Sequence, residues 1–145
     1  MDERACAYLA GLIDGEGYIG IKKARSKHMV SPSYQARIQV RMVDEPAIKF
    51  LADMMGGNYY LESPSAAKGR PLFCYAATAG KAEIVLRLIL PYLRVKRTVA
   101  ETVLEFRALQ ATSRQHRDGK ILTDEYLARC DAFYLRCKEI NRPGS

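Results

Sequence analysis

Residues 8–17 read YLAGLIDGEG, and this stretch decides how the N-terminal part of the chain folds. Its apolar residues recur at helical spacing; they are Tyr8, Leu9, Leu12 and Ile13. Asp14 and Glu16 follow between glycines, which commonly end helices. The run from Gly17 to Arg25 then has the composition of a strand. We therefore predict a helix, capped by Asp2, that delivers two carboxylates to its exit directly before a strand.

The clearest strand pattern follows at Tyr34–Val43. Apolar side chains alternate there with polar ones; the apolar set is Ala36, Ile38, Val40 and Met42, and the polar set is Gln35, Arg37, Gln39 and Arg41. One face of this strand suits a core, and we expect the other face to meet a polar partner.

Turn and cap residues divide the rest of the chain. We predict helices at 44–55, 81–90, 98–109 and 123–140, weaker strands at 58–62 and 72–78, and a polar loop at 112–120. The order predicts an α+β fold: an αββαββα core whose antiparallel four-stranded sheet has helices on one face and an open basic face on the other. The C-terminal helices are additions to this core. We expect one domain over residues 1–142 and a disordered tail at 143–145.

Charge is distributed unevenly. The net charge is +7, and residues 17–43 contain six Lys and Arg but no acidic residue. A basic stripe confined to one region favours a surface that faces a polyanion, although an ordinary solvated strand pair is the alternative. No apolar run is long enough for a membrane span, and the N-terminus does not resemble a secretory signal, so we expect an intracellular protein with no membrane partner.

The four cysteines form no CxxC pair. Because they lie within apolar patterns, buried thiols are a better interpretation than a zinc site or a disulfide framework; they are Cys6, Cys74, Cys130 and Cys137.

Residues 9–17, LAGLIDGEG, resemble the LAGLIDADG motif of homing endonucleases, with Gly15 and Glu16 in place of Ala and Asp. Residues 90–97, LPYLRVKR, are similar to the segment after the family's third helix, which carries an active-site lysine. The motifs and the order of elements cover about residues 5–110 in this resemblance.

The resemblance implies a homodimer, because the chain holds one copy of the motif. Single-motif members pack their motif helices against each other at a two-fold axis, and small residues allow close approach of the two backbones. The expected interface residues are Ala7, Ala10, Gly11 and Asp14. An isologous dimer predicts a pseudo-palindromic target.

The resemblance also implies the catalytic groups. Glu16 would be a catalytic metal ligand, with the backbone carbonyl of Gly15 contributing, and the cofactor would be Mg²⁺ or another divalent cation such as Mn²⁺. Lys96 would stabilise charge at the scissile phosphate. The alternatives are that Glu16 is a surface carboxylate and Lys96 a plain phosphate contact. A further polar active-site residue could be Gln39, Arg41 or Asp44, of which Asp44 could equally cap a helix.

Outward-facing residues of the sheet are candidates for reading DNA, because Gln and Arg make bidentate contacts to base edges in the major groove. The DNA-binding candidates are Lys22, Ser26, Gln35, Arg37, Gln39, Arg41, Arg70 and Tyr75. A second set is expected to contact phosphates; it comprises Lys23, Arg25, Lys27, Lys68, Arg114 and Arg117.

Together these features predict a homodimeric, metal-dependent, site-specific double-strand DNA endonuclease in a DNA-containing compartment. A non-catalytic DNA-binding regulator on the same fold is one alternative. An RNA-binding intron maturase is another.

Overall fold

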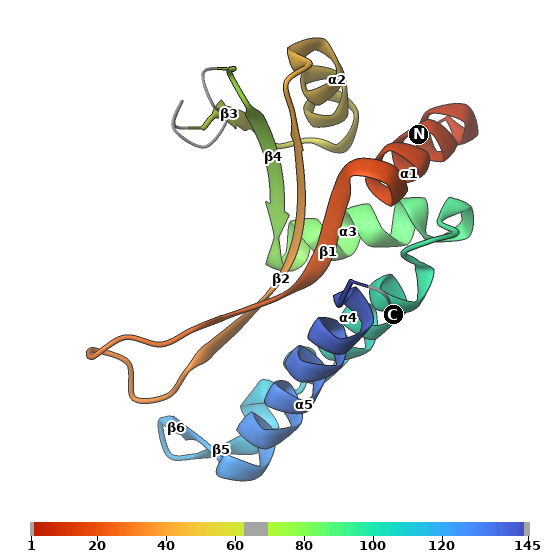
Figure 1. The fold of residues 1–145 in the computed structure, drawn as a ribbon. Coiled ribbons are helices and arrows are strands. Elements are labelled where there is room, and N and C mark those ends of the chain that lie inside the picture. Colours follow the sequence, from red (N-terminus) through yellow and green to blue (C-terminus); the bar gives the residue numbers. More distant parts are fainter. Residues whose placement is uncertain (1, 63–69, 144–145) are drawn as a thin grey trace.

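The computed structural model describes residues 2–62 and 70–143 of the chain. In chain order the main elements are α1 (Glu3–Glu16), β1 (Gly17–Ala24), β2 (Ser33–Met42), α2 (Glu45–Met55), β3 (Tyr59–Leu61), β4 (Phe73–Thr78), α3 (Ala79–Ile89), α4 (Arg97–Ala111) and α5 (Asp124–Asn141). Short 3-10 turns follow α3 and α4, at Leu90–Tyr92 and Ser113–His116. The α+β fold class and the predicted order αββαββα are confirmed (Figure 1).

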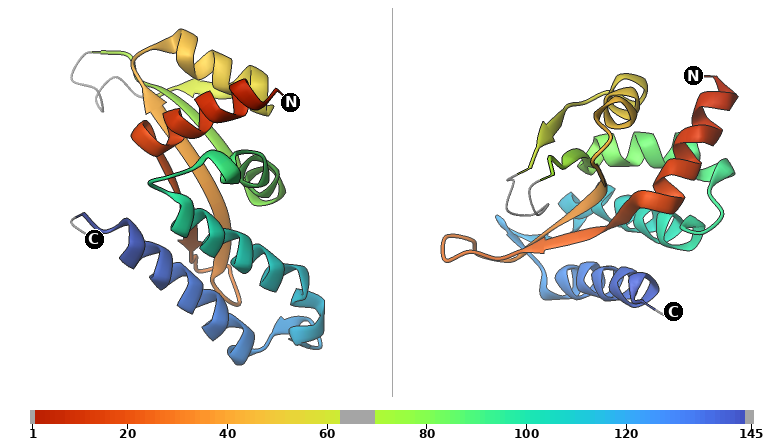
Figure 2. Two further views of the ribbon diagram at one scale, coloured as in Figure 1. Left: turned by 90° about the vertical axis from the view of Figure 1, so that its right-hand side faces the viewer. Right: turned by 45° about the horizontal axis from the view of Figure 1, so that its top comes forward.

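Strands β1 to β4 form one antiparallel sheet in the order β1-β2-β4-β3. The helices gather on one side of it, and the β1–β2 hairpin extends away from the rest of the sheet (Figures 1 and 2). Helix α5 runs beside β1, which is an edge strand, and its Asn141 Nδ2 donates to the carbonyl of Ile19 at 2.9 Å. This contact satisfies a backbone group that an uncovered edge would leave open to another chain.

The ends of the helices follow the predicted caps. Oδ1 of Asp2 accepts a hydrogen bond from the Arg4 amide at 2.9 Å, and Oδ2 of Asp44 accepts one from the Ala47 amide at 3.1 Å. The residue that follows α1 is Gly17, and its φ is one that any residue adopts. A glycine is needed there because an added Cβ would lie 2.8 Å from the Ile13 carbonyl oxygen.

The core lies between the sheet and the helices. On β2 the alternation is as predicted, since Ala36, Ile38 and Val40 are fully buried. Two expectations from the sequence are wrong at this level. Ala10 is fully buried within the chain, so it does not lie on a free helix face. Tyr75 is also fully buried, because residues 73, 75 and 77 of β4 lie on the core side of the sheet. The prediction needed residues 74, 76 and 78 on that side instead.

Other differences are local. Strand β1 ends at Ala24, so Ser26 lies in the β1–β2 connection, where its Oγ accepts from the His28 amide at 3.3 Å. The predicted loop at 112–120 contains a 3-10 turn and leads into a small hairpin, β5 (Arg117–Asp118) with β6 (Ile121–Leu122). Lys68 and residues 144–145 of the expected tail lie outside the described residues. Within the described ranges no helix is long and apolar enough to cross a membrane.

Candidate nucleic-acid interface and active site

The outward face of β1 and β2 carries polar side chains from both strands. The strand register places Lys22 opposite Gln35 and Gly20 opposite Arg37, with Tyr18 opposite Gln39. Neither strand contains an acidic residue. The predicted polar face therefore exists, and it presents hydrogen-bonding groups and positive charge along the whole length of the hairpin.

Arg37 lies near the middle of this face. Its Nη2 donates to Oε1 of Gln35 at 3.1 Å, so the two side chains hold each other in place. Arg37 Nε is buried and has no hydrogen-bond partner within residues 2–62 and 70–143. Among the described side chains, no other buried nitrogen or oxygen lacks one. A planar guanidinium that is fixed at one edge suits bidentate recognition of a guanine or a phosphate.

A groove of about 540 Å³ lies along this face, and the C-terminal half of α5 forms one of its walls. The sheet contributes Lys22, Arg37 and Gln39, and the helix contributes Tyr134, Lys138 and Asn141. The sequence patterns did not predict that α5 would line the polar face, since nothing local in α5 indicates which strand edge it covers.

Tyr18 is a site residue that the sequence interpretation missed. Its ring lies along the polar face over Gly20, where an added Cβ would come within 2.2 Å of the Tyr18 hydroxyl oxygen. Partial burial raises the pKa of this hydroxyl above its ordinary value. Like any tyrosine hydroxyl it is protonated near neutral pH and can donate a hydrogen bond. The signal was available, because Tyr18 has the same strand parity as Lys22.

The second half of the sheet offers less to a polyanion. Arg41 Nε is paired with the Glu62 carboxylate at 2.5 Å, which offsets its charge. The β4 residues on the same side of the sheet as Arg37, Gln39 and Arg41 are Cys74, Ala76 and Thr78, of which Cys74 is fully buried. Arg70, three residues before β4, is exposed.

Lys23 also lines the groove beside α5, but its ammonium group is paired within the protein. By register it pairs with Tyr34 on the face that carries the core, and its Nζ is 2.7 Å from Oδ1 of Asp131 on α5. The Asp131 carboxylate therefore offsets the charge that Lys23 would offer to a phosphate, and the role of Lys23 as a phosphate contact stays a prediction. Arg25 and Lys27, in the β1–β2 connection, are exposed.

The end of α1 is tied to the segment that carries Lys96. The Asp14 carboxylate accepts from the amides of Arg94 at 2.8 Å and Lys96 at 2.9 Å. Lys96 Nζ donates back to the Asp14 carbonyl oxygen at 2.6 Å. Cations are favoured at the carbonyl end of a helix. The half-buried ammonium group of Lys96 is thus fixed at Asp14, which precedes Glu16 by two residues.

Glu16 itself is exposed, as is Gly15. The last four carbonyl groups of a helix have no intrahelical donor, and the helix end carries partial negative charge. A carboxylate and carbonyl oxygens at this point are the hard donors that Mg²⁺ prefers. In the part of the chain that the structure describes, no group of three or more His, Cys, Asp or Glu side chains lies together as a metal site.

One face of α1 remains uncovered. Ala7, Gly11 and Gly15 are exposed at a spacing of four residues, so they form a stripe of small residues. A groove of about 510 Å³ runs beside it, lined by Ala7, Gly11 and Asp14 together with Pro91, Tyr92 and Arg94. Of the predicted interface residues, Ala7, Gly11 and Asp14 thus share one surface, and Ala10 does not.

The four cysteines are all buried, in keeping with their apolar surroundings in the sequence.

The fold matches solved structures of homing endonucleases. I-Vdi141I, an archaeal intron-encoded homing endonuclease complexed with DNA, matches with a TM-score of 0.79 at 10% identity, over 100% of this chain and 89% of that chain. I-CvuI, in complex with a DNA target, matches with a TM-score of 0.76 at 17% identity, over 99% of this chain and 85% of that chain. This chain has the LAGLIDADG endonuclease fold.

Another structure with the LAGLIDADG fold differs in length. The meganuclease I-SmaMI bound to DNA matches with a TM-score of 0.71 at 18% identity, over 97% of this chain but only 45% of its own. No family model and no curated protein sequence matches the chain. The LAGLIDADG assignment therefore rests on the fold and on the motif at residues 9–17.

Proposed function

We propose that this chain is a site-specific DNA endonuclease that cuts a double-stranded, pseudo-palindromic target as a homodimer with divalent cations. The observation that carries the proposal is the junction of α1 with the polar sheet face. Glu16 and the anchored Lys96 belong to one helix end, and the acid-free face of β1 and β2 begins one residue later.

The exposed face of α1 supports the homodimer. Two helices with stripes of small residues can approach closely, and a two-fold axis would bring the two Glu16 residues together. I-SmaMI is about twice as long as this chain, which is what a single chain with two such units would need. Asp14 would then act within each protomer, by holding Lys96, as well as beside the interface.

The donor set fits a divalent cation. Glu16 and the Gly15 carbonyl of each protomer would hold it together with phosphate oxygens of the DNA. When bound, such a cation activates a water molecule and stabilises the leaving oxygen in phosphodiester hydrolysis. Glutamate in place of aspartate keeps the oxygen donors and lengthens the side chain by one methylene.

Lys96 would place a positive charge beside the scissile phosphate, where negative charge develops in the transition state. Of the three candidates for a further polar group, Asp44 caps α2 and Arg41 is paired with Glu62. We therefore assign this role to Gln39, because the register places Gly17, next to Glu16, opposite its neighbour Val40.

Strand length sets the scale of recognition. At about 3.3 Å per residue, the seven steps from Gly17 to Ala24 cover about 23 Å, which corresponds to about seven base pairs of B-DNA. A two-stranded ribbon fits the major groove. Each protomer would thus read a half-site of about this length, with Arg37 in its middle.

The test is cleavage of a randomised duplex library in Mg²⁺, with sequencing of the cut ends and a chelator control. We expect recurrent cuts at one pseudo-palindromic site, lost when the metal is removed. Selection of duplex DNA without cutting in any divalent metal would overturn the endonuclease and favour a regulator. Preferential binding of structured RNA over duplex would favour a maturase.

A further inference from the structure

The outer part of the β1–β2 hairpin has little support from the sheet. Strand β4 pairs with β2 only over residues 37–42, so Ser33–Ala36 pair with β1 alone. An isolated two-stranded ribbon is marginally stable in water and twists readily. Something outside the sheet must therefore fix this half of the hairpin if its side chains are to hold a defined position.

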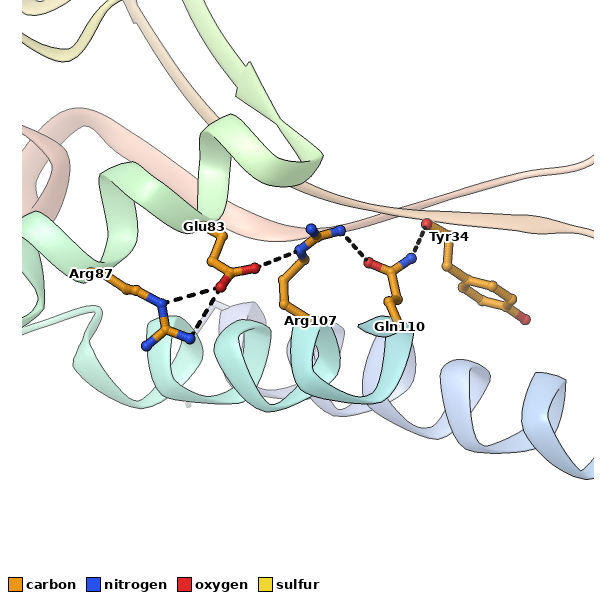
Figure 3. Close-up of polar contacts among 5 residues, drawn as sticks. All are labelled: Tyr34, Glu83, Arg87, Arg107 and Gln110. Atoms are coloured by element: carbon orange, nitrogen blue, oxygen red, sulfur yellow. Dashed lines mark hydrogen bonds and ion pairs between the residues drawn. The ribbon is translucent and has the colours of Figure 1, made fainter. Parts of the chain in front are cut away.

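Helix α4 supplies one contact. Gln110 Nε2 donates to the carbonyl of Tyr34 at 2.9 Å, on the β2 edge where β4 no longer pairs (Figure 3). The Gln110 amide is oriented by Arg107, whose Nη1 donates to its Oε1 at 3.0 Å. Arg107 is in turn held by Glu83 of α3, with Nε 3.0 Å from the carboxylate. The strand edge is thus connected to two helices of the core.

Helix α5 supplies the second contact. One oxygen of Asp131 accepts from Lys23 Nζ at 2.7 Å and from the Tyr34 hydroxyl at 2.8 Å. Lys23 Nζ also lies 5.6 Å from the ring centre of Tyr34 and 5.7 Å from that of Tyr134. The hydrogen bond from Lys23 and then that from Tyr34 lower the pKa of the Asp131 carboxyl, which keeps it ionised. Lys23 and Tyr34 are a cross-strand pair, so one carboxylate holds both strands.

We infer that Asp131 is a positioning residue for recognition: through Lys23 and Tyr34 it fixes the outer half of the β1–β2 hairpin, and thereby sets which base pairs at the outer end of each half-site are read. This inference rests on the proposed function. We call the contacts of Asp131 with Lys23 and Tyr34 the hairpin brace.

The brace acts through the alternation of the strands. Lys22 and Gln35 are the direct neighbours of Lys23 and Tyr34 and face the opposite side of the ribbon. When Lys23 and Tyr34 are fixed on α5, Lys22 and Gln35 are held in position on the face that would meet the DNA. Binding then requires less ordering of the hairpin, which favours affinity and selectivity. Gln39, near the α1 junction, is braced by β4 and does not need Asp131.

The experiment compares wild type with Asp131→Asn on the target selected from the library. Relative binding and cleavage are measured for every single base-pair change in one half-site. Glu105→Gln is the matched control, because Glu105 pairs with Arg136 of α5 at 3.8 Å instead of with a hairpin residue, and the net charge changes equally. Thermal unfolding shows that each variant is folded.

We expect Asp131→Asn to reduce discrimination at the outer base pairs by at least about fivefold, with inner positions changed less than about twofold. KM should rise while kcat at saturating DNA is kept. Tyr34→Phe, which removes only the hydroxyl, should act in the same direction. A charge-exchanged pair, Lys23→Asp with Asp131→Lys, should recover part of the outer discrimination.

A profile of Asp131→Asn that equals that of Glu105→Gln, or one that weakens all positions uniformly, would overturn the inference. Binding and cleavage by the wild type test the proposed function separately. If the wild type binds its selected site but does not cut, the same profiles are measured by binding and the inference is still decided. A wild type that selects no duplex would contradict both.

Discussion

The two αββ units of this fold have the same order but different surfaces. In the first, β1 and β2 have eight and ten residues and present Lys22, Gln35 and Arg37 outward. In the second, β3 and β4 have three and six residues, and β4 presents mainly small side chains. Under the proposed function, this difference predicts that the first unit contacts and cuts the DNA, while the second completes the sheet and the core.

The largest expected effect tests the chemistry at the end of the first unit. Glu16→Gln removes the proposed metal-binding charge and should lower cleavage at least about 100-fold, the size expected for one group that acts on the transition state. Binding of the target should stay within about threefold of wild type. Single-turnover cleavage and a binding titration measure the two.

Asp53→Asn is the control for this variant, because it removes an equal charge from the exposed face of α2. Equal cleavage by Glu16→Gln and wild type would remove Glu16 from the mechanism.

The next prediction compares one residue from each unit, at a position where β2 and β4 lie opposite each other. Arg37 of β2 lies opposite Thr78 of β4 on the polar face. Arg37→Ala should reduce discrimination about 5- to 150-fold at one or two adjacent base pairs, since a bidentate contact contributes about 1–3 kcal/mol. Thr78→Ala should change it less than about twofold. Cleavage rates on single-substituted targets measure both, and a larger effect at Thr78 would reverse the comparison.

A smaller effect is expected on the salt dependence of DNA binding, where a lysine without an ion-pair partner among the described residues is compared with an arginine that has one. Lys22→Gln should reduce the salt dependence of binding by about 0.9 in log–log slope for each protomer, or about 1.8 for a dimer. Arg41→Gln should reduce it less, because Glu62 offsets the Arg41 charge. Binding titrations over a range of salt concentrations give the slopes. Equal slopes for the two variants would mean that the Arg41–Glu62 pair opens on DNA.

The smallest effect concerns the contacts that join the core helices. Arg107 first, and then Arg87, hold the pKa of the Glu83 carboxyl below its ordinary value. A lowered pKa stabilises the fold above the unfolded-state value, near 4.3, and this contribution is lost as the pH falls through the folded-state value. Glu83→Gln should therefore cost about 0.5–1 kcal/mol of unfolding free energy at pH 7, and progressively less below about pH 4.

Urea unfolding of wild type and Glu83→Gln from pH 3 to pH 7 measures this difference. A difference that stays constant on acidification would assign it to packing instead of charge.

The first unit could be predicted from the sequence because its patterns are long. Ten residues of strict alternation in β2 leave one choice of face. In β4, with six residues that are mostly apolar or small, the parity is not specified, which is how Tyr75 came to be assigned to the wrong side. Ala10 and Ala7 look alike in the sequence, since a small side chain suits a core and a surface equally.

The hairpin brace could not be predicted. Lys23 and Asp131 are 108 residues apart, and neither has a local signal of the other. Lys23 looks like any basic residue of the stripe until the path of α5 is known. The hydrogen bonds between Asp14 and Lys96 could not be predicted either, because the two residues are 82 positions apart. The motif indicated that both residues matter, and the fold shows how one holds the other.

The most direct test of the central claim is the preference profile of the wild type on its selected target, measured as the relative cleavage rate for every single base-pair change. The account predicts two mirror-related strips of strong preference, each about seven base pairs long, as β1 and β2 of two protomers would read. A profile without mirror symmetry, or one whose strong preferences lie outside these strips, would contradict it.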